Sequence, residues 1–236
     1  MAEPSSTWNV LDHGPLERLA DNLWRVEGAV PRLPLRRQML VVRLDGGRLL
    51  IFNGVAVRDD VRAEIEALGT PTYLIVPNAW HRLDAPAFKA RYPDLKVYCP
   101  ARGRRKVGQV VPIDGTYDDF PDEPSISFEH LEGSTKLEGV MKVRCDDGVT
   151  LVFGDALFNQ PHLKGLHGII LRLIGSSGGP RVTRMARFAI VKDRTAFKAH
   201  LLRLADTEGL NRLVPAHIDV IHKDAAAVLR SVAQRL

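Results

Sequence analysis

Residues 72–99, with the sequence TYLIVPNAWHRLDAPAFKARYPDLKVYC, form the clearest strand–turn–helix–strand pattern in the chain. The apolar run 73–76 predicts a strand, and it leads into a polar turn that carries one histidine, His81. Residues 86–92 then predict a short helix, and residues 95–99 predict another strand. Because active sites are often built where a strand ends in a polar turn, the role of His81 is the first question that the sequence raises.

Alternating strands and helices are also predicted outside this stretch. Asp45-Gly-Gly47 and Asp146-Asp-Gly148 are each flanked by apolar runs, which predicts two β-hairpins. The other predicted strands cover 22–27, 38–44, 48–52, 126–131, 140–145, 149–153 and 213–214, and the other predicted helices cover 59–68, 195–205 and 225–236. Two sets of strands with their own helices predict an α+β fold, a four-layer αββα sandwich of two mixed β-sheets flanked by helices.

Two stretches lack this periodicity. Residues 107–125 are rich in Asp and Pro, which predicts an exposed loop. Residues 161–180 are rich in glycine and contain His162 and His167, so we expect a polar, mobile loop whose histidines are candidates for the lining of a pocket. The apolar residues 169–174 within it are a candidate surface for contact with a second copy of the chain.

Length and charge limit the classes of protein to consider. The chain has 236 residues, of which 45% are hydrophobic, and this favours a single domain over 1–236 with residues 1–19 as an N-terminal extension. Lys and Arg number 33 against 28 Asp and Glu, and the isoelectric point is about 9.4. The basic residues are scattered except at Arg102-Gly-Arg-Arg-Lys106, either a solvated loop or a site for phosphate or an acidic partner. No nucleic-acid motif accompanies them, so we do not expect nucleic acid as a partner.

The cysteines and the hydropathy pattern predict a cytoplasmic protein. Cys99 and Cys145 lie in predicted strands, which is typical of reduced, buried thiols. No segment approaches the roughly 18 to 20 apolar residues of a transmembrane helix, and the first ten residues, MAEPSSTWNV, are too polar for a signal peptide. We therefore expect no membrane partner.

Candidate metal ligands stand where three predicted strands end. His81 follows the strand 73–76, Asp155 follows 149–153, and His217 follows 213–214. Two neutral imidazoles with one carboxylate are a suitable ligand set for zinc, iron or manganese. Each residue also has a structural interpretation: His81 could cap the next helix, Asp155 could hold backbone N–H groups in its loop, and His217 could be a buried, hydrogen-bonded side chain.

The order of these segments resembles the metallo-β-lactamase fold over roughly residues 20–236. The segments that carry the resemblance are ARYPDLKVY, FEHLEGSTKLEGVMKV, TLVFGDALF and LVPAH. The motifs VPN..H, GDALFN and VPAH also resemble a divergent bacterial branch of this fold that is described as a domain of unknown function. This second resemblance implies no particular activity.

The resemblance places His81 on the last histidine of the family's His-x-His-x-Asp-His motif. In the same register, Val76 and Asn78 stand where two metal-binding histidines would be, and Trp80 stands in place of the aspartate. Because an indole offers one donor and no ligand atom, Trp80 is expected to fill the space of a lost ligand and to make the pocket drier.

The other family motifs match in part. Glu132-Gly-Ser-Thr135 resembles the family's Pro-Gly-His-Thr turn, so Ser134 would stand in place of another metal-binding histidine. Asp155 matches the carboxylate that normally bridges two metal ions, and His217 matches the terminal histidine. The resemblance therefore implies that the first metal site is lost, whereas His81, Asp155 and His217 are retained from the second.

Two functions of different classes follow. The first is a mononuclear metal-dependent hydrolase, in which water bound to the ion has a pKa near 7 and attacks an ester, thioester, lactone or amide. Asn78, Asn159 or His162 would then stabilise the developing oxyanion. The alternative is a catalytically inert protein in which the three retained residues form a polar network, and the old cleft binds a small molecule or a protein.

Overall fold

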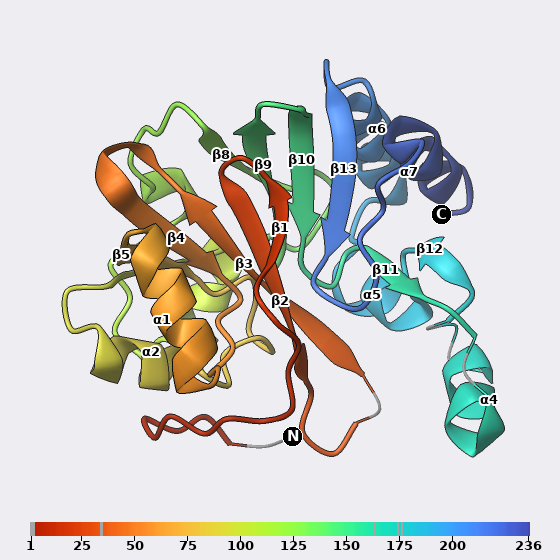
Figure 1. Cartoon of the computed structure of the whole chain (residues 1–236). Helices are drawn as coiled ribbons and strands as arrows, with labels where there is room; N and C mark the ends of the chain where they lie inside the picture. The colour runs from red at the N-terminus through yellow and green to blue at the C-terminus, as the bar shows by residue number, and fades with distance from the viewer. Residues whose placement is uncertain (1–2, 34, 163, 174, 176) are drawn as a thin grey trace. The chain divides into compact units, whose positions relative to one another are not determined.

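The computed structural model describes residues 3–33, 35–162, 164–173, 175 and 177–236. The chain divides into two compact units, Met1–Ser125 and Ile126–Leu236. Each unit has its own main β-sheet (Figure 1). Each unit also has its own hydrophobic core. Whether residues 1–236 constitute one domain, with 1–19 as an extension, stays a prediction.

The first unit is built on a seven-stranded mixed sheet with the order β1-β2-β3-β4-β5-β6-β7. Strands β1 to β4 pair antiparallel, and β4 to β7 pair parallel. The strands are β1 Glu17–Ala20, β2 Leu23–Ala29, β3 Arg36–Arg43, β4 Arg48–Phe52, β5 Thr70–Ile75, β6 Lys96–Cys99 and β7 Gly115–Thr116. Its helices are α1 Asp59–Leu68, α2 Ala85–Arg91 and α3 Arg104–Val107, with 3₁₀ turns at Asp45–Gly47, Ala101–Gly103 and Tyr117–Asp119.

The β4–α1–β5 unit positions the turn that contains His81. Helix α1 carries two acidic residues in its first turn and is followed by Gly69, where a Cβ would lie 2.2 Å from the carbonyl oxygen of Gly47. The chain then returns as β5, parallel to β4, with Phe52 paired to Ile75. The residues that follow these two strands therefore emerge at the same edge of the sheet.

The second unit contains a four-stranded mixed sheet with the order β13-β10-β9-β8 and a two-stranded sheet, β11-β12. The β10–β13 pair is parallel and aligns Phe153 with Pro215, whereas β8–β9, β9–β10 and β11–β12 pair antiparallel. The strands are β8 Ile126–His130, β9 Gly139–Cys145, β10 Gly148–Phe153, β11 Phe158–Gln160, β12 Gly179–Arg181 and β13 Leu210–Pro215. The helices are α4 Gly165–Leu173, α5 Arg184–Ala189, α6 Arg194–Ala205 and α7 Ala225–Gln234. Mixed sheets with helices in both units confirm the predicted α+β class.

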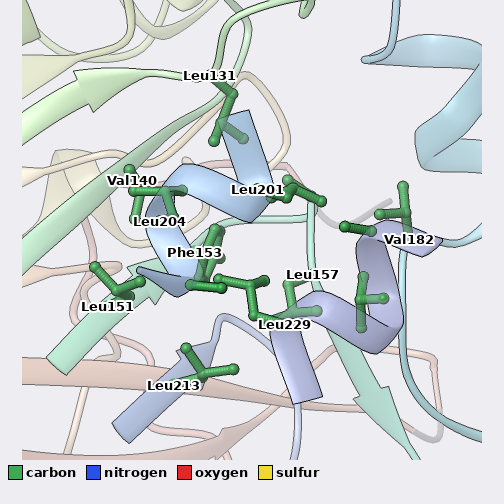
Figure 2. Close-up of a cluster of buried hydrophobic side chains, with 14 of the residues drawn as sticks. Leu131, Val140, Leu151, Phe153, Leu157, Val182, Leu201, Leu204, Leu213 and Leu229 are labelled. Atoms are coloured by element: carbon green, nitrogen blue, oxygen red, sulfur yellow. The ribbon is translucent and has the colours of Figure 1, made fainter. Parts of the chain in front are cut away.

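The core of the second unit forms where aliphatic side chains of α6 and α7 meet the strands β10 and β13. Figure 2 shows Phe153 among leucines that come from these elements, including Leu204 on α6, Leu213 on β13 and Leu229 on α7. Phe153, Leu213 and Leu229 are fully buried. This packing fixes the end of β10, and with it the start of the loop that carries Asp155.

Two of the predicted loops contain regular structure. Residues 107–125 include β7 and a 3₁₀ turn, and Gly115–Tyr117 are buried because β7 extends the sheet beyond β6. In the stretch 161–180, α4 and β12 were not predicted, because glycine lowers helix and strand propensity. Strand β12 forms here through its pairing with β11. Ile174 and the side chain of His167 lie outside the described residues.

The sequence also predicted reduced, buried cysteines and no transmembrane helix. Both cysteines are free, and burial raises the pKa of the Cys99 thiol to about 12. Cys145 was expected to be buried but is half-buried, because it stands at the end of β9 beside the hairpin turn. No helix among the described residues is both long and apolar enough to cross a membrane.

The buried ring of Phe153 provides a test of the second core. We expect Phe153→Ala to lower the free energy of unfolding by about 3–5 kcal/mol, because it leaves a cavity among packed leucines. Phe188→Ala is the matched control, since Phe188 on α5 is 94% exposed, and it should change the free energy by less than about 0.5 kcal/mol. Urea denaturation followed by circular dichroism measures both values, and equal effects would show that this core is wrongly assigned.

A charged contact between β8, β9 and α6 makes the second unit sensitive to acid. Glu129 pairs with Lys142, and its Oε2 lies 3.4 Å from Nε2 of the buried His200. His200 and Lys142 lower the pKa of Glu129 to about 2, although burial acts in the opposite direction.

Replacement of Glu129 should therefore have a pH-dependent effect. Since the folded-state pKa lies below the ordinary 4.5, the stabilisation is complete above pH 4.5 and is lost as the pH falls towards 2. We expect Glu129→Gln to cost about 1 kcal/mol near neutral pH, a modest value because the carboxylate is partly solvated, and to cost almost nothing near pH 2. Urea titrations across this range measure the difference, and the exposed Glu64→Gln serves as the control. A cost independent of pH would contradict the assignment.

Candidate functional site

The turn after β5 is shaped by the side chain of Asn78. Asn78 is fully buried, and its Oδ1 accepts hydrogen bonds from the backbone N–H groups of Trp80, at 2.8 Å, and of His81, at 3.1 Å. An Asx turn of this kind satisfies two backbone donors where no helix does so. The carboxamide oxygen of Asn78 thus fixes the backbone of His81 and, as an acceptor, cannot serve in the predicted oxyanion role.

Asn53 determines which nitrogen of His81 carries a proton. Its Nδ2 donates to the carbonyl oxygen of Gln38 at 2.8 Å, so its Oδ1 must be the atom that lies 2.9 Å from Nδ1 of His81. An oxygen acceptor requires the proton on Nδ1, which leaves the lone pair of His81 on Nε2. Asn53 is fully buried and has a left-handed backbone, with φ of 57°, directly after β4.

A buried ion pair supports this part of the first unit. The Nη2 of Arg37 lies 2.5 Å from Oδ2 of Asp84, and the same oxygen accepts a hydrogen bond from the backbone N–H of Ala56 at 3.1 Å. Both side chains are at least nine-tenths buried. The pair links β3 to the start of α2, and the bond from Ala56 adds the segment after β4. Removing one partner of the pair would leave a buried charge without compensation.

In the second unit, Asp155 and His217 are in contact. They follow the paired ends of β10 and β13, and Nε2 of His217 lies 3.2 Å from Oδ1 of Asp155. The imidazole of His217 is buried and stacks on Phe158, with ring centroids 4.8 Å apart and an interplanar angle of 27°. Two ligands of one tetrahedral zinc ion, each about 2.0–2.1 Å from it, lie about 3.3 Å apart, so the separation suits a shared ion as well as a direct ion pair.

Glu138 holds the backbone of Asp155. Its carboxylate is fully buried, and Oε1 accepts a hydrogen bond from the N–H of Asp155 at 3.1 Å. A Cβ on Gly154 would lie 2.3 Å from Oε2 of Glu138, so no larger residue fits between the two without displacement. The glycine of the Gly-Asp motif therefore has a steric reason in this chain.

The loop after His217 is held by β11. The Nδ2 of Asn159 donates to the carbonyl oxygen of Asp219 at 2.9 Å, and Asn159 also bridges to Ile218. Ile218 has φ of 67°, which is uncommon for a β-branched residue and signals local strain. The amide nitrogen of Asn159, a predicted oxyanion donor, thus has a structural partner.

Three other predicted pocket residues have different surroundings. Trp80 is 41% exposed, which is more than a side chain that fills a dry pocket would be. Ser134 is half-buried, and its Oγ accepts from the N–H of Lys136 at 3.1 Å. His162 is exposed, and its Nδ1 lies 3.0 Å from Oγ of Ser177.

Sequence reasoning missed the residues that support the candidate ligands. Asn53 carried a usable signal, because it is a polar residue immediately after an apolar strand, as Asp155 is. Glu138 and Arg37 carried none, because a single charged residue next to a strand is ordinarily exposed. Their burial depends on contacts with residues distant in sequence.

Comparisons with known proteins identify the fold. No protein-family model and no curated protein sequence matches the chain. It is similar to the solved structure of the metallo-β-lactamase FIM-1 from Pseudomonas aeruginosa in the mono-zinc form, with 12% identity, a TM-score of 0.61 and coverage of 98% of each chain. It is also similar to a metallo-β-lactamase from Erythrobacter litoralis with β-mercaptoethanol in the active site, with 11% identity, a TM-score of 0.63 and coverage of 94% of this chain and 96% of the other. The chain has the metallo-β-lactamase fold, as the sequence resemblance predicted, and the low identity fits a divergent branch of it.

The hydrogen bond from His81 to Asn53 is testable without any assay of activity. Two-bond ¹⁵N–¹H NMR correlations of the ring should show His81 as the Nδ1–H tautomer at neutral pH, and Asn53→Ala should convert it to a mixture or to the Nε2–H form. Asn211→Ala, which removes an exposed amide bonded to Asp147, is the control and should leave the ring signals unchanged. An Nε2–H tautomer in the unsubstituted protein would contradict the orientation inferred for Asn53.

Proposed function

We propose that the chain is a mononuclear metal-dependent hydrolase whose ion is held by His81, Asp155 and His217, a His/Asp/His set of the kind that can hold a metal ion. The observation that carries the proposal is the contact of 3.2 Å between Asp155 and His217 at the paired ends of β10 and β13. His81 is assigned as the third ligand from the sequence resemblance. We propose zinc first, with iron or manganese as alternatives that the same ligands accept.

The residues that orient the candidate ligand atoms support this assignment. Asn53 holds the proton on Nδ1 of His81 and so keeps Nε2 available as a lone-pair donor. Glu138 fixes the backbone of Asp155, and Phe158 supports the ring of His217. Partners that orient ligands in this way are typical of functional metal centres. Their loss commonly lowers the metal affinity 10- to 100-fold, which corresponds to about one to three kcal/mol of binding free energy.

The proposed reaction is hydrolysis of an ester, thioester, lactone or amide. When bound, a divalent ion supplies a water molecule with a pKa of about 7 as the nucleophile. The Nδ2 amide of Asn78 is the proposed donor to the developing oxyanion. The Nδ2 of Asn159 donates to the carbonyl oxygen of Asp219. Asp155 acts as a ligand, and we assign no separate general base. A small-molecule substrate and a cytoplasmic location in bacteria belong to this proposal.

The alternative function is that of an inert protein with a retained polar network. A distance of 3.2 Å between an imidazole nitrogen and a carboxylate oxygen is also that of an ordinary ion pair. In addition, Val76, Asn78, Trp80 and Ser134 stand in place of four residues of the family's usual ligand set. In this form the chain would bind a small molecule or a protein without catalysis.

An assembly of identical chains is proposed separately. Ile169 is 55% exposed and Leu173 is 69% exposed on one face of α4, which supports contact with a second copy. Nucleic acid is not proposed as a partner.

The metal content of the protein tests the proposed function. We expect protein purified without chelators to contain about one equivalent of zinc, iron or manganese, as measured by inductively coupled plasma mass spectrometry. His81→Ala and His217→Ala should each lower this content at least about tenfold and abolish hydrolysis of model esters and thioesters.

His162→Ala is the matched control. This histidine is exposed and its Nδ1 contacts Oγ of Ser177, so the variant should retain the metal. Addition of zinc to metal-stripped protein should raise the melting temperature, since an ion that binds only the folded state stabilises it. A metal-free preparation whose melting temperature does not respond to zinc, iron or manganese would support the inert alternative.

A further inference from the structure

A basic pocket lies in the second unit, and neither Asp155 nor His217 lines it. Its volume is about 250 Å³, and it is lined by Arg187, Val191, Lys192, Arg194 and Leu236. Arg187 comes from α5, Val191 and Lys192 come from the connection to α6, and Arg194 is the first residue of α6. Three of its five lining side chains are cationic, and the other two are aliphatic.

The three cationic side chains of this pocket are available to an external anion. Within the described part of the chain, none of the observed ion pairs involves Arg187, Lys192 or Arg194. The neighbouring Asp193 accepts hydrogen bonds at Oδ1 from the N–H groups of Thr195, at 2.9 Å, and Ala196, at 3.0 Å. Its carboxylate therefore serves as the N-cap of α6, where the helix macrodipole adds further positive potential.

The guanidinium groups around Arg187 are close enough to repel one another. Partial burial, and then the charges of Arg194, Arg181, Arg184 and Arg235, lower the pKa of Arg187. The Nη2 of Arg187 donates to the backbone carbonyl of Arg235, which orients the side chain without neutralising it. A bound anion would relieve this repulsion, and a concave surface of one charge concentrates ions of the opposite charge.

We propose that this pocket binds a phosphate or carboxylate group attached to a small apolar moiety. The anion would contact the guanidinium groups of Arg187 and Arg194 and the ammonium of Lys192, because planar guanidinium groups match the oxygens of such anions. The apolar part would contact Val191 and Leu236. A volume of about 250 Å³ suits a small ligand or the head of a larger one, and not a folded domain.

Two sources of such a ligand share this chemistry, namely a soluble phosphate or carboxylate ester and an anionic lipid headgroup. The second source is relevant because α5 also carries Phe188, which is 94% exposed, and Met185, which is 64% exposed. A symmetric contact between two copies through this pocket would bring the same cations face to face, and their repulsion opposes such a contact. The site lies within the second unit, and its occupation requires neither a metal nor hydrolytic activity.

NMR titration of the full chain tests the pocket with n-butyl phosphate and with inorganic phosphate. We expect n-butyl phosphate to shift the backbone amide signals of residues 191, 192 and 194 saturably, and to bind more tightly than inorganic phosphate because of the aliphatic surface. The double variant Lys192→Gln/Arg194→Gln should raise the Kd at least about tenfold, through loss of two charged donors. Both positions are exposed, so the variant should fold, which the dispersion of its spectrum verifies.

Lys223→Gln is the matched control, because Lys223 is exposed in the same unit but does not line the pocket, and its Kd should equal that of the unsubstituted protein. Co-sedimentation with vesicles of phosphatidylglycerol, compared with phosphatidylcholine, separates the two sources. If the protein sediments with phosphatidylglycerol vesicles, and both the double variant and Phe188→Ser lose this sedimentation, the ligand is a lipid headgroup. If the protein binds n-butyl phosphate but does not sediment with these vesicles, the ligand is soluble. Absence of both kinds of binding, or binding that the double variant leaves unchanged, would overturn the proposal.

Discussion

Parallel strand pairing is the constraint on which the candidate site depends. In each unit one parallel pair brings two strand ends to the same edge of a sheet, β4 with β5 in the first and β10 with β13 in the second. Polar residues that follow the paired ends then become neighbours, although they are far apart in sequence. The contact of Asn53 with His81 and that of Asp155 with His217 both arise in this way. A shift of either register by one residue would reverse the faces of the strands and separate these contacts.

Buried polar groups convert this placement into defined geometry. The amide of Asn53 and the carboxylate of Glu138 are fully buried, and each holds one atom of a candidate ligand residue in place. Burial of such groups costs free energy unless they are hydrogen-bonded, so their partners cannot be exchanged freely. Gly154 shows the same limit sterically, because the carboxylate of Glu138 occupies the space where a Cβ would be. In this chain, burial and hydrogen bonds restrict the residues that support the candidate ligands more than they restrict the candidate ligands themselves.

The sequence predicted most of the strands and the residues at their ends, because both depend on local periodicity and on turn chemistry. It singled out His81, Asp155 and His217 as candidate ligands at strand ends, and the Asp155–His217 contact follows from strand pairing. It missed α4, whose glycines favour a loop, and β7, which gains stability only from pairing with β6. It also missed Asn53 and Glu138 as supporting residues, because burial of a polar side chain is decided by tertiary contacts. The role given to Trp80 was inferred from the family's ligand pattern alone, and a pattern of this kind cannot show that the indole is 41% exposed.

Left-handed backbone conformations adjoin candidate ligands in each unit. Two non-glycine residues with left-handed backbones adjoin the candidate ligands: Asn53, with φ of 57°, hydrogen-bonds to His81, and Ile218, with φ of 67°, directly follows His217. Asparagine adopts this conformation readily, whereas a β-branched residue such as Ile218 does so rarely, at a cost of about 1–3 kcal/mol. At Ile218 the loop after His217 is therefore held against its local backbone preference by surrounding contacts, among them the bridge to Asn159.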